Sequence, residues 1–105
     1  MLFSDYKNHK NAVINPKLLW EYDLNGFDYI GMRNLVVQRV VERGWPDDYF
    51  AILNLYGEDG VKDAIRQISS LNKKDMNFVS KVFSIPLTEL KCYSRQLSKN
   101  PHWSY

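Results

Sequence analysis

Residues 78–93 read FVSKVFSIPLTELKCY, and their spacing predicts a helix, a short turn and a second helix. Two helices that cross steeply need a small residue where they approach each other, and Ser80 supplies it. Ser84 follows four residues later at the turn, where glycine is the usual residue because it tolerates a left-handed backbone. Pro86 suits the first position of the next helix, and Leu90 is expected to anchor that helix in the core. This stretch therefore predicts a tightly connected helical pair near the C-terminus.

Start and stop signals divide the preceding chain into further helical segments. Polar residues that can cap a helix precede apolar residues spaced three or four apart, and three glycines mark helix ends. The caps are Asn15, Asp28, Asp47 and Asn72, and the glycines are Gly26, Gly44 and Gly57. No Asn-Gly or Asp-Gly pair lies between alternating apolar runs, so no β-hairpin is predicted. We expect an all-α fold, a single compact domain of five to six short helices with a helix-turn-helix-like C-terminal unit.

The length and the charge distribution set the organisation of this domain. The 105 residues suffice for one domain with a modest core, and we expect a loose arm over residues 1–14, a helical domain over 15–98 and a tail over 99–105. The formal net charge of +2 hides a division: residues 1–60 sum to −3, and residues 61–105 sum to +5. A basic half of this kind is a candidate surface for a polyanion.

Several classes of protein are excluded by composition. Cys92 is the single cysteine, so no intrachain disulfide is expected, and His9 and His102 have no metal-ligand spacing. The N-terminus carries Asp5 and lacks the apolar run of about 7–15 residues that a signal peptide needs. No apolar stretch reaches the roughly 18 residues of a membrane span. We expect a cytoplasmic protein with no membrane partner, no metal and no cofactor.

Catalytic constellations are also missing from the sequence. The adjacent acids Asp47-Asp48 and Glu58-Asp59 point to different helix faces and sit where helix caps are expected. Cys92 has no base oriented toward it, and there is neither a glycine-rich phosphate loop nor an HExxH motif. We therefore expect a non-enzyme.

The C-terminal pair resembles a helix-turn-helix, which implies that its second helix could read DNA. On this interpretation Arg95 donates to guanine, Gln96 contacts adenine and Glu89 accepts from a cytosine amino group. Cys92 is expected on the same exposed face, and lysines of the two helices contact phosphates. The candidate nucleic-acid-binding residues are Lys73, Lys74, Lys81, Thr88, Glu89, Lys91, Arg95, Gln96 and Lys99. The alternative is a solvated lysine-rich face on a helix pair that binds nothing.

The three tryptophans have different expected roles. Trp20 is interpreted as a core residue, and Trp45 as an aromatic staple against the helix that follows Pro46. Trp103 lies in the terminal HWSY, where it either packs back onto the domain or anchors a partner. Trp103 is therefore a candidate partner-binding residue.

Residues 17–93 resemble a small uncharacterised bacterial (Bacteroidetes-type) domain family. The matching segments are LWEYD at 19–23, RVVERG at 39–44, YG at 56–57 and LNKKDMNF at 71–78. Such proteins are often encoded beside nucleotidyltransferase-type toxins, so the resemblance implies an antitoxin or regulatory role. It implies no catalytic residues.

Two functions remain open from the sequence. The first is a non-catalytic, DNA-binding, antitoxin-like regulator that uses the basic C-terminal half. The second is a protein-protein interaction module that binds a cognate toxin or another partner without contacting DNA. The oligomeric state is not predicted.

Overall fold

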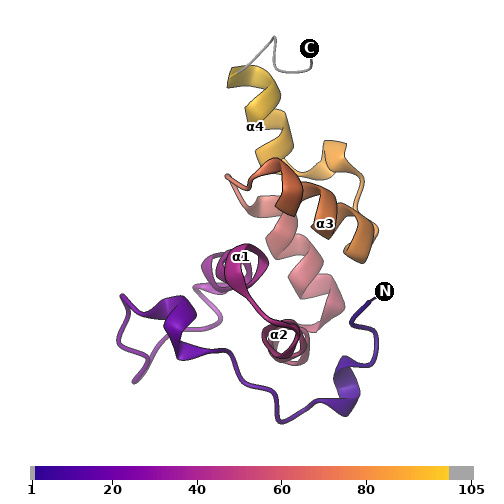
Figure 1. Cartoon of the computed structure of the whole chain (residues 1–105). Helices are drawn as coiled ribbons and strands as arrows, with labels where there is room; N and C mark the ends of the chain where they lie inside the picture. Colours follow the sequence, from indigo (N-terminus) through magenta and orange to yellow (C-terminus); the bar gives the residue numbers. More distant parts are fainter. Residues whose placement is uncertain (1, 100–105) are drawn as a thin grey trace.

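Four α-helices and three 3-10 turns make up the computed structural model, which describes residues 2–99 and, over 96–99, the backbone alone (Figure 1). The helices are α1 (Arg33–Arg43), α2 (Pro46–Gln67), α3 (Lys73–Phe83) and α4 (Lys91–Lys99), and the 3-10 turns are η1 (Tyr6–Asn8), η2 (Pro16–Leu19) and η3 (Leu87–Glu89). The described residues contain no strand. The expected all-α, single-domain fold is confirmed.

Helix α2 lies at the centre of the core and contacts α1, α4 and η1. The four valines of α1 are fully or almost fully buried because they fall at a helical spacing of four on two neighbouring rows. They pack in one cluster with apolar residues from both halves of α2, among them Ile52, Val61 and Ile65. Neither α2 nor any other helix of the described residues is long and apolar enough to cross a membrane.

A kink at Gly57 divides α2 into two helical halves. The residue has φ 77° and ψ 165°, a backbone conformation that glycine adopts without a Cβ clash. The predicted helix stop at Gly57 thus corresponds to a sharp change of direction inside one continuous element. Glu58, just after the kink, pairs with Lys62 at 3.7 Å across one helical turn.

Asp48, and not the expected Asp47, caps the start of α2. The buried Asp48 carboxylate accepts hydrogen bonds from the backbone N–H of Trp45 and from that of Asn15, both at 2.8 Å. Asp47 is exposed. Pro46 occupies the first helical position, so the acid two residues later is the one whose side chain reaches back to the preceding N–H.

The segment before α1 is less helical than the sequence predicts. Asn15 does cap a turn, because its side chain accepts from Lys17 N at 3.0 Å, but that turn is the short η2. Asp28, the predicted cap of the next helix, instead accepts from Gly31 N at 3.0 Å, and α1 begins only at Arg33. The local Asp28–Gly31 turn therefore delays the helix by about one turn.

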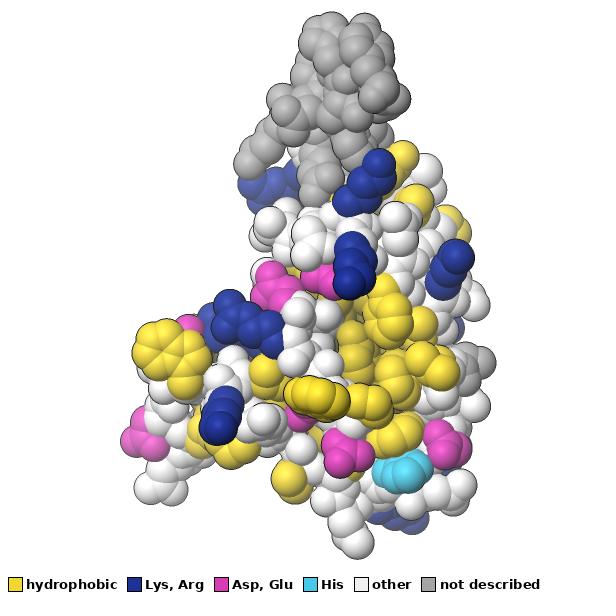
Figure 2. All heavy atoms as spheres, viewed as in Figure 1, with side chains coloured by type: hydrophobic (Ala, Val, Ile, Leu, Met, Phe, Trp, Pro, Cys, Tyr) yellow, Lys and Arg dark blue, Asp and Glu magenta, His cyan; other side chains and the backbone are white. Residues whose placement is uncertain are grey.

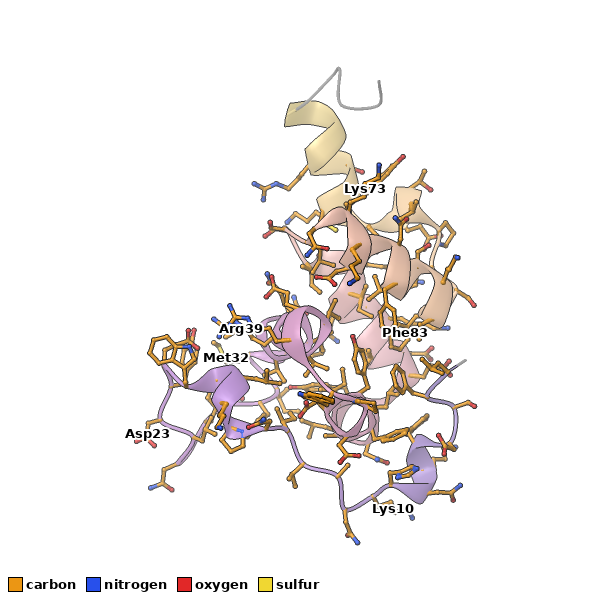
Figure 3. The ribbon with its side chains drawn as sticks, in the orientation of Figure 1. Lys10, Asp23, Met32, Arg39, Lys73 and Phe83 are labelled. Carbon is orange, nitrogen blue, oxygen red and sulfur yellow. The ribbon has the colours of Figure 1, made fainter. Side chains whose placement is uncertain are left out.

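Arg39 ties the η2 region to α1 (Figure 3). Its guanidinium donates to both carboxylate oxygens of Glu21, at 2.6 and 3.1 Å, and to the carbonyl of Leu18 at 3.0 Å. The bidentate contact with Arg39 lowers the pKa of Glu21.

Two tryptophans expected to pack inside the molecule are on its surface. Trp20 and Trp45 are each 73% exposed. Leu18 and Leu19 of η2 turn inward, so the next residue, Trp20, faces solvent.

The N-terminal segment is more buried than expected, because Phe3 is 5% exposed and stacks on Tyr49 with ring centroids 4.5 Å apart. Part of the expected loose arm thus belongs to the core.

Candidate functional site

Helix α3 has one buried and one basic side. Asn72 caps it by accepting from Asp75 N at 2.7 Å, as the sequence predicts. Its buried side chains are Met76, Val79 and Phe83, and Phe83 points toward α2, where its ring lies 6.4 Å from that of Tyr49 (Figure 3). The exposed residues include Lys73, Lys74 and Lys81.

These three lysines occupy neighbouring rows on the outer surface of α3. Lys73 and Lys81 are eight residues apart and share a row with Asn77, because residues four apart lie one above the other on a helix. Lys73 lies at the end of the molecule from which α4 projects (Figure 3). Lys74 belongs to the adjacent row, together with Phe78.

The turn after α3 has a left-handed residue at the position where the sequence carries serine in place of the usual glycine. Ser84 is left-handed, with φ 55° and ψ 44°. The N–H groups of Ser84 and Ile85 both bind the carbonyl of Ser80, and the Ser80 hydroxyl donates to the carbonyl of Ile85 at 2.6 Å. This 6→1 closure is the Schellman arrangement, in which the left-handed residue is usually glycine. Ser80 thus closes the turn through both its carbonyl and its hydroxyl group.

The second helix begins five residues later than expected. Leu87–Glu89 form η3, Leu90 has an extended backbone, and α4 starts at Lys91. The side chain of Leu90 is fully buried, and the chain bends there so that Leu90 reaches the core. As a consequence, Thr88 and Glu89 are exposed residues of η3 and are not part of α4.

Helix α4 presents Lys91 and Arg95 to solvent. The two residues are four apart, and Ser94 beside them is also exposed. Cys92, which was expected on this exposed face, is instead fully buried. Burial raises the pKa of its thiol, which favours the neutral form. The side chains of Gln96 and Lys99, and the whole of Trp103, lie outside the described residues.

An ion pair connects the turn to α2. Arg66, in the last turn of α2, donates to Glu89 at 3.0 Å and to Asp63 at 3.1 Å. Glu89 is the only acid among residues 76–95. Arg66 also binds Asp63, so its single positive charge is shared between two carboxylates and offsets the charge of Glu89 only in part. Figure 2 shows Lys and Arg side chains over this end of the molecule.

A groove that the sequence did not predict lies beside α3, next to Lys74. Its volume is about 640 Å³, and its walls come from the N-terminal segment, the α1–α2 corner, the start of α2 and α3 (Figures 1 and 2). The lining residues are Leu2, Phe3, Asp5, Val41, Gly44, Pro46, Tyr49, Phe50, Lys74, Asp75 and Phe78. Burial raises the pKa of Asp75 in the α3 wall. No local sequence pattern places residue 2 against residue 78, so only the tertiary structure reveals this site.

Within residues 2–95 no three His, Cys, Asp or Glu side chains converge to form a metal site.

Comparison with known proteins gives one family match: residues 14–65 match the model of a family of unknown function, DUF6922. The match ends within α2 and does not include α3 or α4. No curated protein and no solved structure matches the chain.

Proposed function

We propose that the protein is a non-catalytic binding protein that contacts duplex DNA through α3, the turn and α4. The observation that carries this proposal is the pair of exposed basic rows, Lys73 and Lys81 on α3 and Lys91 and Arg95 on α4. The one acid between them, Glu89, is held by Arg66. A surface of this kind attracts phosphates, because each Lys or Arg that neutralises a phosphate releases a counterion.

The proposed DNA contacts are of two kinds: those that position the protein on the phosphate backbone and those that read the bases. In this proposal Lys73 and Lys81 of α3 meet phosphates, and such contacts fix the position of a protein on DNA without reading its sequence. Arg95 is the described residue of α4 best suited to a base edge, since its guanidinium can donate twice to guanine. Glu89 has no reading role in this proposal, because its carboxylate is already engaged. We infer weak sequence preference and strong dependence on salt.

The antitoxin-like role is part of the same proposal. It draws on the resemblance to bacterial proteins encoded beside nucleotidyltransferase-type toxins. The division of charge is compatible with a DNA-contacting half and a partner-binding half.

A second candidate function is binding of a protein partner without DNA. It is favoured by exposed apolar side chains within residues 14–65, of which those of Trp20, Ile30 and Trp45 are the most exposed. Isolated exposed apolar residues are common, but tryptophan is enriched at the energetic centres of protein interfaces. Recovery of a cognate toxin with the protein from its native host, together with no retention of DNA at low salt, would favour this alternative.

The DNA proposal is tested by fluorescence anisotropy with a labelled random-sequence duplex at low salt. The variant Lys91→Ala/Arg95→Ala is expected to lose about tenfold or more in affinity, because two phosphate or base contacts disappear. The matched control is Lys10→Ala/Lys17→Ala, which removes two exposed charges of the N-terminal region; Lys10 lies at the opposite end of the molecule from Lys73 (Figure 3). Equal losses in both variants, or no binding by the wild type, would refute the proposal.

A further inference from the structure

The groove beside α3 has two edges with complementary character. The α3 edge carries Lys74 and the 38% exposed Phe78. The opposite edge, formed by the N-terminal segment, carries Asp5 and the 67% exposed Leu2. Each edge thus offers one exposed charged and one exposed apolar side chain, and the two charges have opposite sign; the Asp5 carboxylate also lies 3.2 Å from His9 Nε2 within its own chain. Figure 2 shows the apolar floor between basic side chains over α3 and acidic side chains on the opposite rim.

The floor between the edges is aromatic. Tyr49 stacks on Phe3 and lies 6.0 Å from Phe78, measured between ring centroids. Asp75, next to Lys74 on α3, also lines the groove and is half-buried, whereas Lys74 is exposed. An apolar hollow with exposed aromatic and aliphatic rims is typical of an interaction surface.

We propose that this groove face binds a second copy of the same chain about a two-fold axis that runs along the groove. A rotation of 180° about this axis places the α3 edge of each copy on the N-terminal edge of the other. Lys74 of one copy then meets Asp5 of the second copy, and Phe78 meets Leu2. Because a two-fold axis generates every contact twice, the face forms two such charge pairs and two such apolar contacts.

Trp45 supplies the side chain that covers the apolar space between the two copies. It lies between Gly44 and Pro46, both of which line the groove, and it is 73% exposed. In the two-fold arrangement the Trp45 indoles of both copies enter the space between the two grooves and become buried. An aromatic side chain at the centre of an interface commonly contributes much of the binding energy. This interface needs no nucleic acid, and its test uses none.

The test is the molar mass in solution, measured by sedimentation equilibrium over a series of protein concentrations. The wild type is expected to reach twice the 12.4 kDa of one chain. Lys74→Glu places two acids against each other at both symmetric contacts, and Asp5→Lys places two bases there, so each variant alone is expected to dissociate at least tenfold more readily. The control Lys10→Glu makes the same charge reversal on an exposed residue that does not line the groove, and should leave the mass unchanged.

Mixing the two charge-reversal variants, Lys74→Glu and Asp5→Lys, provides the decisive measurement. In the mixed dimer the glutamate introduced at position 74 of one variant faces the lysine introduced at position 5 of the other. The native Lys74 and Asp5 meet at the second contact, so both charge pairs are restored. The equimolar mixture is therefore expected to recover the mass of a dimer, and Trp45→Ala alone is expected to weaken the dimer about tenfold or more. A monomeric wild type, or a mixture that stays as dissociated as its components, would overturn the proposal.

Discussion

The guanidinium of Arg66 holds the carboxylate of Glu89 at 3.0 Å and so partly offsets the charge of the one acid that lies, in the sequence, between the basic residues of α3 and those of α4. Both side chains are partly exposed, so the pair stabilises the fold by no more than about 1 kcal/mol. Its larger effect is on the surface potential, because an unpaired carboxylate at this position would repel phosphates.

Glu89→Gln is expected to raise the affinity for duplex DNA by about twofold to fivefold, because a negative charge is removed and Arg66 is released toward the phosphates. Asp63→Asn, which removes the other acid bound to Arg66, serves as the control and should have the smaller effect. The measurement is anisotropy with a random-sequence duplex. A loss of affinity restricted to duplexes with particular cytosines would instead show that Glu89 reads bases.

Ser84→Gly is expected to raise the free energy of unfolding by about 0.5–1 kcal/mol. The left-handed backbone at φ 55° strains a residue that has a Cβ atom, and glycine has none. Ser84→Ala keeps the Cβ and should remain close to the wild type. Urea denaturation of the three proteins measures the differences. A lower stability of the glycine variant would mean that the entropy of its unfolded chain outweighs the strain relieved.

Asp48→Ala is expected to lower the free energy of unfolding by about 2–4 kcal/mol, because two backbone N–H groups lose a charged acceptor. The adjacent Asp47→Ala changes an exposed residue and should stay within about 0.5 kcal/mol of the wild type. Chemical denaturation measures both changes. Equal losses at the two positions would contradict the assignment of Asp48 as the cap.

The ion pair of Glu21 with Arg39 makes stability depend on pH. The pKa of Glu21 in the folded protein lies below its ordinary value of 4.5. The stabilisation is therefore fully present above about that value and is lost as the pH falls through the lowered folded-state pKa. Denaturation curves at several acidic pH values should show a smaller loss for Glu21→Gln than for the wild type. Identical pH profiles would refute the role of this pair.

Local signals predicted the parts of the fold that depend on neighbouring residues. Asn15 and Asn72 cap the turns that they were expected to cap, and Ser84 adopts the left-handed turn. The basic side of α3 also follows from sequence, because its buried residues recur at a helical spacing. These features need only a few consecutive residues to be satisfied.

The remaining features depend on contacts between distant residues. Leu90 bends the chain to reach the core, which delays α4 and leaves Glu89 beside Arg66 of α2. Phe3 is buried because Tyr49 offers its ring 46 positions later in the chain. Neither the burial of Leu90 nor the stacking of Phe3 on Tyr49 leaves a periodic signal in the sequence, so the groove and the true start of α4 could not be predicted.

The salt dependence of DNA binding tests the central claim most directly. If Lys73, Lys81, Lys91 and Arg95 all contact phosphates, the logarithm of the binding constant should fall against the logarithm of salt concentration with a slope of about −4. Lys91→Ala/Arg95→Ala should reduce the magnitude of that slope by about 2. A slope near zero, or one that the double variant leaves unchanged, would contradict the account.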